Sequence, residues 1–249
     1  MDRALYISMS GAKQNTLGQT AHANNLANAS TTGFRSDYTQ SRAMGVFGEH
    51  FPSRAYAMTE RPASDFRQGP LQETGRRMDV AIEGAGWFAV QGPDGQEAYT
   101  RAGDLSVDPE GRLLNGQGLQ LIGDGGPITL PEFTSIEVSR TGLVSIQPAG
   151  EQPAGVAEPV QLKLVNPDGR ELEKGEDGLF RFRDPNAGPA QIDEGITLVN
   201  GFVEGSNVNA VSELTSLIAL NRQYEMQVKL MKRVDENTAA TTQLLSNQG

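Results

Sequence analysis

The sequence predicts an α+β fold in which two helices, one at each end of the chain, form a coiled-coil layer and a mainly antiparallel all-β central domain is inserted between them. Three observations lead to this prediction. Apolar residues near both ends recur at the three- and four-residue spacing of a helix face. All 13 prolines lie between Pro52 and Pro189. In that middle part, short apolar runs alternate with Asp-Gly and Asn-Gly turns, which are typical of hairpins.

Length, charge and cysteine content narrow the classes of function. With 249 residues the chain can bury a substantial core. Its formal net charge is −10, and it has no basic cluster, which argues against nucleic acid and anionic membranes as partners. The absence of cysteine excludes disulfides, thiolate metal sites and thiol nucleophiles.

The apolar runs are too short for membrane or secretory segments. None approaches the roughly 18 residues that a membrane span requires, so the sequence predicts no membrane insertion. The apolar run at residues 4–7 is also far shorter than the core of a secretory signal. A protein with this sequence is therefore expected to leave the cytoplasm, if it does, by another route.

Residues 1–30 are predicted to contain the first helix, at 3–28. Its seam is poor in large apolar side chains, so the helix needs tertiary support in water. Asn24, Asn25 and Asn28 mark its end, either as capping or fraying positions or as amides that bond a neighbouring helix. Gly33 can take the positive φ that redirects the chain. The heptad seam of this helix is Leu5, Met9, Ala12, Thr16, Gln19, Ala23 and Leu26.

Residues 31–75 are predicted to form an extended connector or interaction arm. The span from 36 to 74 has little periodicity and contains Pro52, Pro62 and Pro70. A structureless loop of that length is uncommon inside a compact domain. We therefore expect the arm to pack on its own subunit or on a neighbouring one, and the sequence leaves both alternatives open.

Residues 76–205 are predicted to form an antiparallel sandwich or small barrel, because short strands alternate there with turn sequences. Residues 147–158, rich in Pro, Gly and Ala, are expected to form a surface loop. The strands are expected at residues 78–83, 87–91, 97–100, 112–114, 119–122, 136–138, 143–146, 160–164, 179–182 and 196–199.

Residues 206–249 are predicted to contain the long helix around which the chain is arranged, at 208–245. Asn209 or Asn207 is the expected N-cap, and Glu213 lies near the positive end of the helix dipole. An apolar stripe of this length requires a surface to pack against. The heptad seam of this helix is Leu214, Leu217, Asn221, Tyr224, Val228 and Met231.

Motifs for cofactors and metals are weak. The Gly84-x-Gly86 segment resembles a dinucleotide fingerprint, but a strand and Pro93 follow it where a helix is needed, which favours a hairpin turn. His22 and His50 are the only histidines, and without cysteine they give no zinc spacing. The sequence therefore predicts no cofactor and no metal site.

Carboxylates are plentiful, and they keep two alternative function classes open. A pair such as Asp79 and Glu83 could serve a periplasmic enzyme that acts on cell-wall glycan, although no Gly-x-Ser-x-Gly elbow or EF-hand loop is present. The other alternative is a ligand-binding module that the helices only dimerise. No residue pattern rises to a catalytic constellation, so we predict no catalytic residue.

Several segments resemble the signatures of the bacterial flagellar rod and hook protein family, and their order matches the family along the whole chain. Further matches at 126–128, 162–165 and 175–179 are similar to a proximal rod member, with the distal rod protein as the alternative. The signature segments are residues 24–35, 79–88, 99–103, 204–211 and 222–225.

The resemblance implies a structural subunit of the proximal rod of the flagellar basal body, which spans the periplasm. The terminal helices would polymerise into the axial drive shaft that transmits motor torque, with the β domain outside them. The resemblance also implies self-association, contacts with the proximal rod proteins FlgB and FlgC and the distal rod protein FlgG, and secretion by the flagellar type III export apparatus.

The subunit interface is therefore expected on the two helices. Adjacent subunits would fill seams that one molecule cannot close, because contacts that do not close by symmetry propagate along an axis. The expected interface residues are Leu5, Met9, Ala12, Thr16, Gln19, Asn24, Asn25, Leu26, Asn28, Leu214, Leu217, Ile218, Asn221, Tyr224, Val228 and Met231.

Overall fold

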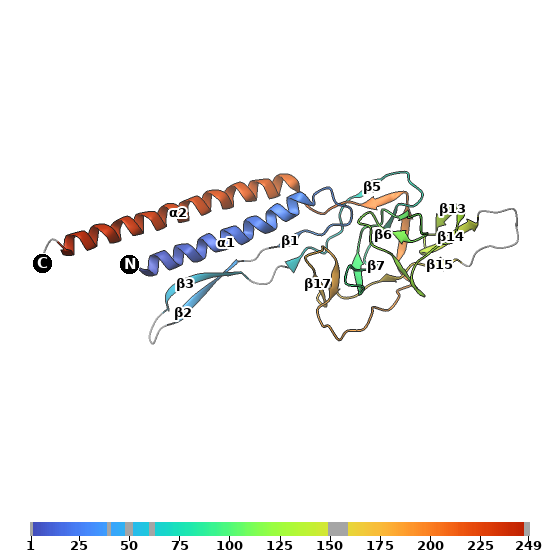
Figure 1. The fold of residues 1–249 in the computed structure, drawn as a ribbon, viewed down its shortest axis with the longest axis horizontal. Coiled ribbons are helices and arrows are strands. Elements are labelled where there is room, and N and C mark those ends of the chain that lie inside the picture. The colour runs from blue at the N-terminus through green and yellow to red at the C-terminus, as the bar shows by residue number, and fades with distance from the viewer. Residues whose placement is uncertain (1, 39–40, 48–51, 60–62, 149–158, 247–249) are drawn as a thin grey trace. The chain divides into compact units, whose positions relative to one another are not determined.

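A computed structural model of the chain describes residues 2–38, 41–47, 52–59, 63–148 and 159–246. It confirms the predicted order of a helix, a mainly antiparallel β region and a second helix (Figure 1). The chain divides into two compact units. The helical unit consists of Met1–Ala29, Ser36–Asp65 and Val208–Gly249, and the β unit consists of Ser30–Arg35 and Phe66–Asn207.

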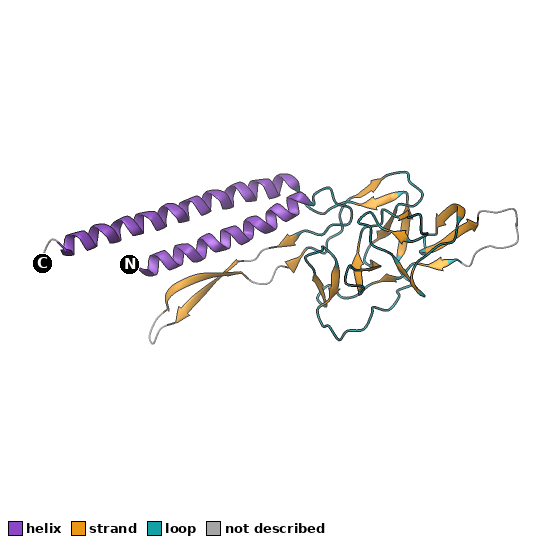
Figure 2. Cartoon of the chain, viewed as in Figure 1, coloured by secondary structure: helices purple, strands orange, loops and turns teal. Residues whose placement is uncertain are grey.

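The helical unit is built on two antiparallel helices that lie side by side, α1 (Asp2–Ala27) and α2 (Ala210–Ser246) (Figures 1 and 2). Their close approach uses two glycines of α1. A Cβ atom placed on Gly18 would lie 3.1 Å from Leu220 Cδ1, and one placed on Gly11 would lie 3.2 Å from Gln227 Nε2. Both predicted helices are therefore present, and they pack on each other within one chain.

The N-cap of α2 is Asn209. Its Oδ1 accepts hydrogen bonds from the backbone N–H groups of Val211 and Ser212, both at 3.1 Å. These bonds satisfy two donors that lack a partner within the helix. Among the described residues, neither helix is long and apolar enough to cross a membrane.

The segment predicted as an extended connector contains regular strands. In the helical unit, β2 (Ser41–Phe47) pairs with β3 (Pro52–Thr59), and β3 lies against α1 of the same chain. A shorter pair, β1 (Asp37–Tyr38) with β4 (Ala63–Ser64), flanks this hairpin. Phe51 and the rest of 48–51 lie outside the described residues. The part of the arm that contacts α1 therefore packs on its own subunit.

The β unit contains sheets of five, three and two strands, and every strand pair among the described residues is antiparallel. The five-stranded sheet has the order β16 (Leu164–Val165), β7 (Trp87–Gln91), β8 (Glu97–Thr100), β18 (Phe180–Phe182) and β17 (Leu172–Lys174). The three-stranded sheet has the order β13 (Phe133–Val138), β14 (Leu143–Pro148) and β15 (Val160–Gln161). The two-stranded sheets are β6 (Val80–Glu83) with β19 (Thr197–Asn200), β5 (Leu71–Glu73) with β20 (Phe202–Glu204), β9 (Ser106–Val107) with β10 (Leu113–Leu114), and β11 (Ile122–Gly123) with β12 (Gly126–Pro127).

Most predicted strands are present with shifted ends, and the differences have simple causes. Strands of two or three residues, such as β9, β12 and β17, are too short to show a period of two. The predicted strand at 160–164 divides into β15 and β16, which belong to different sheets. The predicted loop at 147–158 falls mostly on 149–158, which lie outside the described residues.

The turn after β6 also differs from its prediction. Gly84 and Gly86 have positive φ angles of 85° and 131° and a strand follows them, as expected for a turn. However, β6 pairs with β19 and β7 pairs with β8 and β16. The prediction of a hairpin is therefore wrong, because this turn carries the chain from one sheet to another.

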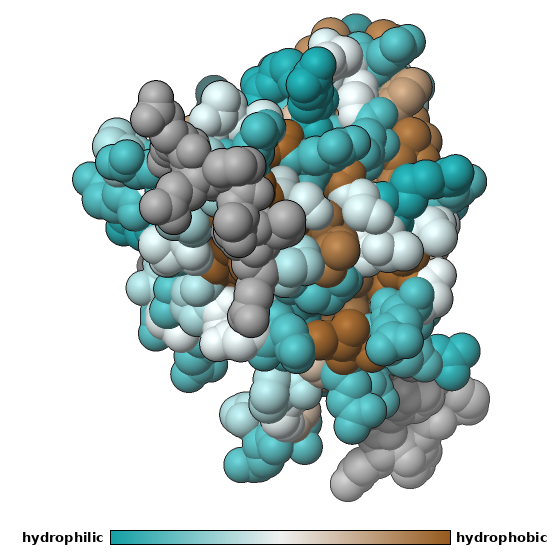
Figure 3. Space-filling model, turned by 90° about the vertical axis from the view of Figure 1, so that its right-hand side faces the viewer, coloured by the Kyte–Doolittle hydropathy of each residue, from teal (hydrophilic) through white to brown (hydrophobic). Residues whose placement is uncertain are grey.

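The core of the β unit forms on both faces of β7. Phe88 and Val90 belong to a large apolar cluster, whereas Trp87 and Ala89 point to a second cluster with Tyr99. Alternate residues of a strand point to opposite faces, so β7 is buried on both sides. Hydrophilic residues cover most of the face of the molecule shown in Figure 3, where hydrophobic residues form separate small areas.

Candidate functional site

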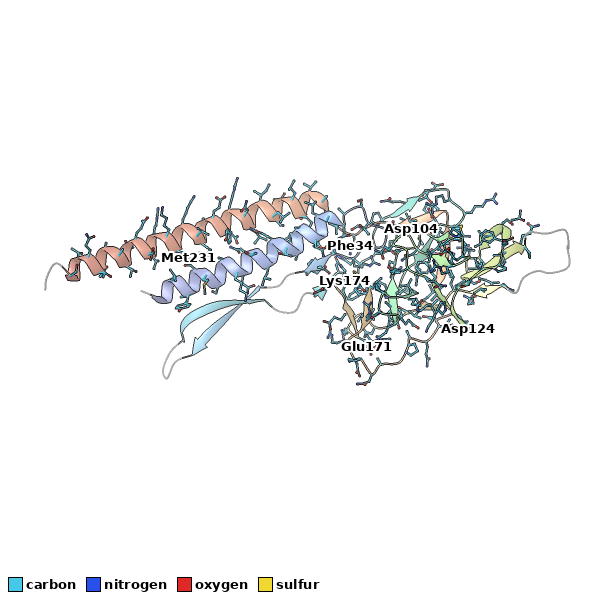
Figure 4. All side chains as sticks on the ribbon, viewed as in Figure 1. Phe34, Asp104, Asp124, Glu171, Lys174 and Met231 are labelled. Atoms are coloured by element: carbon cyan, nitrogen blue, oxygen red, sulfur yellow. The ribbon has the colours of Figure 1, made fainter. Side chains whose placement is uncertain are left out.

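The expected interface residues of α2 divide between a side that contacts α1 and a side that is exposed. Leu217 and Met231 are half-buried, and Met231 lies on the side of α2 that faces α1 (Figure 4). Leu214, Ile218 and Val228 are 51%, 50% and 41% exposed. We name the exposed row the outer stripe, and its residues are Val211, Leu214, Ile218, Asn221 and Val228.

The seam toward α1 has the predicted spacing but a shifted position on α2. The apolar face of α2 is wider than α1 can cover, so a periodicity that marks the whole face cannot tell which edge contacts α1. Tyr224, 38% exposed, lies at the border of the two sides. The half-buried side consists of Glu213, Ser216, Leu217, Leu220, Gln227, Met231, Val234 and Thr238.

The expected interface residues of α1 divide in the same way. Ala12 is buried, and Leu5, Gln19 and Leu26 are half-buried. Met9 and Thr16 are exposed. Three further apolar side chains of α1 are exposed. The sequence did not predict them at an interface, because they lie outside the weak heptad seam. They are Tyr6, Ile7 and Leu17.

The asparagines at the end of α1 fasten the helix to its own chain. Asn25 is 1% exposed. Its Nδ2 donates to the backbone oxygen of Asp37 at 2.9 Å, and its Oδ1 accepts from the backbone N–H of Asp37 at 2.8 Å. Asn28 Nδ2 donates to the backbone oxygen of Asn24 at 3.0 Å. Asn25 therefore binds β1, which neither sequence alternative anticipated.

A polar contact also joins the two helices. His22 Nδ1 on α1 contacts Glu213 Oε2 on α2, and both side chains are mostly buried. Glu213 is thus held by α1 as well as lying in the first turn of its own helix. This contact fixes the register of the antiparallel pair at the end where α2 begins.

The β unit contains a buried charged cluster that sequence reasoning missed. Glu204 is fully buried, and its Oε1 lies 2.6 Å from Arg35 Nη1 while its Oε2 lies 3.2 Å from Arg101 Nη1. Both guanidinium groups lie over the ring of Trp87, at 5.8 Å and 5.5 Å from its centroid. We call Arg35, Arg101, Glu204 and Trp87 the junction cluster.

The junction cluster brings together residues from four of the segments that resemble family signatures. Arg35 ends the first, Trp87 and Arg101 belong to the two central ones, and Glu204 begins the next. Their wide separation in the sequence hides the contact, since no local period connects them. The one available signal was that each cluster member lies within two residues of a glycine.

Two short segments cross at the junction cluster, residues 33–35 and 204–207, which we call the linking segments because they precede β1 and α2 in the chain. Gly33 N–H donates to the Glu204 backbone oxygen at 2.7 Å, and Asn207 N–H donates to the Phe34 backbone oxygen at 3.3 Å. Lys174 Nζ donates to the Arg35 backbone oxygen at 2.7 Å and lies over the Phe34 ring (Figure 4).

The electrostatics of the junction cluster are set by burial and by one carboxylate. The pKa of Arg101 is lowered to about 10, because burial and the charge of Arg35 lower it by more than the neighbouring Glu204 carboxylate raises it. That pKa still lies above neutral, so both guanidinium groups are charged. The Glu204 carboxylate therefore lies between two cations, and the face of Trp87 supplies additional cation–π attraction.

The residues considered for chemistry are occupied with structural contacts. Asp79 is buried and lies 3.0 Å from Arg76 Nη2, whereas Glu83 is exposed and accepts from Thr197 Oγ1 at 3.4 Å. Within the described residues, no group of three or more His, Cys, Asp or Glu could hold a metal ion. His50 lies outside the described residues.

Comparison with protein families gives three matches along the chain. The model described as "Flagella basal body rod protein" matches residues 5–35. The model described as "Flagellar hook protein FlgE/F/G D1 domain" matches 81–146. The model described as "Flagellar basal body rod FlgEFG protein C-terminal" matches 199–244. The matches thus cover α1, much of the β unit and most of α2.

Curated relatives match over nearly their full length. The flagellar basal-body rod protein FlgF of Escherichia coli is 42% identical over 99% of this chain and 99% of its own, and that of Salmonella typhimurium is 41% identical over the same shares. The flagellar basal-body rod protein FlgG of Buchnera aphidicola from Acyrthosiphon pisum is 32% identical over 97% of this chain and 99% of its own.

Proposed function

The chain belongs to the flagellar basal-body rod protein family, and from that premise we propose that it is a structural subunit of the proximal rod that polymerises through its terminal helices. As a rod protein it is part of the flagellar basal body and is not an enzyme. The FlgF proteins of Escherichia coli and Salmonella typhimurium are 42% and 41% identical, whereas the FlgG protein of Buchnera aphidicola from Acyrthosiphon pisum is 32% identical, and this difference favours the proximal over the distal rod.

The observation that carries this proposal is the outer stripe. Val211, Leu214 and Ile218 are 76%, 51% and 50% exposed, although their spacing is that of a buried helix face. Contiguous exposed apolar side chains on a soluble protein mark interaction surfaces. In the proposed rod, helices of adjacent subunits cover this stripe and form the coiled-coil layer.

The unequal length of the helices supports the same conclusion. α2 has 37 residues and α1 has 26. Because the pair is antiparallel and Gln227 lies opposite Gly11, the last turns of α2 extend past the start of α1. Leu244, in this extension, is 66% exposed. A neighbouring subunit is the partner that can bury it.

The proposal assigns a separate role to each part of the chain. Residues 1–30 and 206–249 form the coiled-coil layer of the drive shaft that transmits torque, 76–205 form the outer β domain, and 31–75 form the arm between them. The partners are further copies of this chain, the proximal rod proteins FlgB and FlgC, the distal rod protein FlgG and the type III export apparatus. All expected interface residues, from Leu5 to Met231, are proposed to lie at or beside subunit contacts.

We also propose that the terminal helices become fully ordered only on assembly. They contain Gly11 and Gly18 within α1 and bury few large side chains, so tertiary support within one subunit is weak. Such a chain remains easy to thread through an export channel. Circular dichroism and hydrogen exchange on the monomer test this: protection of both ends in the free subunit would contradict it.

The outer stripe is tested by replacing its apolar side chains. The double variant Leu214→Ser/Ile218→Ser is expected to fold its β unit normally but to be lost from isolated basal bodies and to abolish swimming in a strain that lacks its own copy. Asn221→Leu completes the stripe and is expected to act in the opposite direction, increasing self-association of the purified subunit.

The matched control is Met226→Ser. Met226 is 60% exposed but lies on another side of α2. Because it is outside the outer stripe, the control is expected to be incorporated and to restore swimming. Normal incorporation of the double variant, with the control also incorporated, would show that the outer stripe is not a subunit contact.

A further inference from the structure

We infer that the junction cluster is a charge clasp that locks the two linking segments to each other and to the β unit, so that Glu204 acts as the positioning residue for both. This inference deepens the proposed function and rests on it, because a rod subunit must hold the chain firmly where it passes from the β unit toward each terminal helix. The Glu204 carboxylate contacts three other parts of the β unit, at Arg35, Gly69 and Arg101.

The charge balance makes Glu204 the central member. Its carboxylate contacts both Arg35 and Arg101, and the side chains of Arg35, Arg101 and Glu204 are 0%, 4% and 0% exposed. Removing one partner of a buried ion pair leaves an uncompensated charge in a low-dielectric site. Loss of Glu204 would take the same carboxylate from both Arg35 and Arg101, and cation–π attraction to Trp87 does not replace a carboxylate.

The hydrogen bonds of the cluster connect segments that are far apart in sequence. Glu204 Oε1 accepts from the backbone N–H of Gly69 at 3.0 Å, and Arg101 Nη2 donates to the Gly84 backbone oxygen at 2.5 Å. Arg35 Nη1 donates to the Arg67 backbone oxygen. None of these bonds is local, so they form together or not at all as the β unit closes.

Backbone packing at the cluster gives independent support. A Cβ atom on Gly33, which has φ of 69°, would lie 2.3 Å from the backbone nitrogen of Ala102. A Cβ atom on Gly69 would lie 2.0 Å from the backbone oxygen of Gly205. Each linking segment therefore touches another part of the β unit with no side chain between them. These direct backbone contacts leave little room for the linking segments to shift relative to the rest of the β unit.

A role in net stability explains the cluster less well than a role in position. Buried ion pairs contribute little net stability compared with apolar residues of similar size, because their desolvation costs as much as their attraction returns. The β unit also has a large apolar core elsewhere, around Phe88 and Val90. Unlike an apolar cluster, the clasp provides directed bonds from Glu204 to Arg35, Gly69 and Arg101.

The test is hydrogen exchange at single-residue resolution on the full-length Glu204→Gln variant. The amides of Gly33, Gly69 and Asn207 are expected to exchange at least about ten-fold faster, whereas the amides of β7 and β8 stay within about two-fold of the parent. The matched control is Glu97→Gln, which breaks the 2.7 Å pair with Lys163 in the same unit. It is expected to leave exchange at the amides of Gly33, Gly69 and Asn207 unchanged.

A second variant separates a clasp from general loss of folding. Arg101→Gln keeps the Arg35–Glu204 pair, so Gly33 and Gly69 are expected to remain protected while exchange rises near residues 100–103. Uniform acceleration across β7 and β8 in Glu204→Gln would overturn the inference in favour of a purely stabilising role. Unchanged linking amides would overturn it outright.

Incorporation into isolated basal bodies is measured for the same variants. We expect Glu204→Gln to be incorporated at a small fraction of the parent level, and Glu97→Gln at the parent level. The monomer exchange experiment does not depend on assembly, so failure of the proposed rod function would leave its result intact. Conversely, normal incorporation of a variant with released linking segments would refute their positioning role and leave the rod function standing.

Discussion

The two units of this chain differ in how completely they bury their apolar side chains. In the β unit, Val80, Phe88, Leu113 and Leu198 are at most 1% exposed. In the helical unit, among residues whose side chains the structure describes, Ala12 is the one buried apolar residue. The β unit is therefore complete within one subunit. The helical unit leaves apolar side chains of α2 exposed, and in the proposed rod further chains cover them.

The two units also differ in where their ion pairs lie: those of the junction cluster are buried, and those within α2 are exposed. The β unit keeps its critical charges inside, in the junction cluster, where each is balanced by residues of the same unit. Ion pairs on α2, such as Lys232–Glu236 at 3.9 Å, lie in solvent and contribute little. The buried core and the buried ion pairs thus lie in the β unit, whereas the proposed assembly surface lies on the helices.

The largest expected effect tests the closed core. Phe88→Ala empties a site that is 1% exposed in the main cluster. Burial loss plus the cavity should lower the free energy of unfolding of the β unit by about 3–5 kcal/mol, measured by urea denaturation followed with the fluorescence of Trp87.

The helical counterpart is Ile218→Ala, at a residue that is 50% exposed. In the monomer it is expected to change the free energy of unfolding by no more than about 0.5 kcal/mol, because little burial is lost. If both substitutions cost the same in the monomer, the contrast between a closed and an open unit would not hold.

Replacing glycine by alanine is expected to have a smaller effect on the free energy of unfolding than Phe88→Ala. The effect should be destabilising in the β unit and stabilising in the helical unit. Gly33→Ala forces a left-handed backbone on a residue with Cβ and places that atom against Ala102, so we expect a loss of at least about 2 kcal/mol. Gly18→Ala meets only the flexible end of Leu220 and should stabilise α1 by up to about 1 kcal/mol. Thermal unfolding followed by circular dichroism measures both.

The outcome of Gly18→Ala also bears on assembly. If this helix needs to be only marginally stable before assembly, the variant should show more helix in the monomer but slower export. A loss of helix would mean that the packing of α1 on α2 cannot yield by the few tenths of an ångström that the new methyl group requires.

Sequence periodicity predicted both helices and most strands because those elements are long enough to show their period. It placed Gly33 at a positive φ, which the structure confirms at 69°. It could not place the seam on α2, because a wide apolar face fits several registers. The β2–β3 hairpin was missed because its residues do not alternate clearly, and the junction cluster was missed because its members meet only through the tertiary fold.

The smallest expected effect is a pH dependence confined to the β unit. Burial raises the pKa of Asp104, and the nearby Asp79 carboxylate raises it further, against backbone hydrogen bonds and Arg76, which lower it. The stability that Asp104 contributes is therefore full below its unfolded value of about 4 and is lost as pH rises through the raised folded pKa. Asp104→Asn should remove this loss, so its urea midpoint should vary less with pH above that value.

Asp177 supplies a control of the opposite sign within the same unit. Its hydrogen bond to Arg181, at 2.7 Å, holds the pKa of Asp177 below the usual value. Its stability is present above the unfolded pKa and is lost as pH falls through the folded one. Asp177→Asn should therefore lower the midpoint at neutral pH, whereas Asp104→Asn should not. Equal shifts in both variants would mean that burial does not control Asp104, and that its partly buried carboxylate is as well solvated as the charges on the open helices.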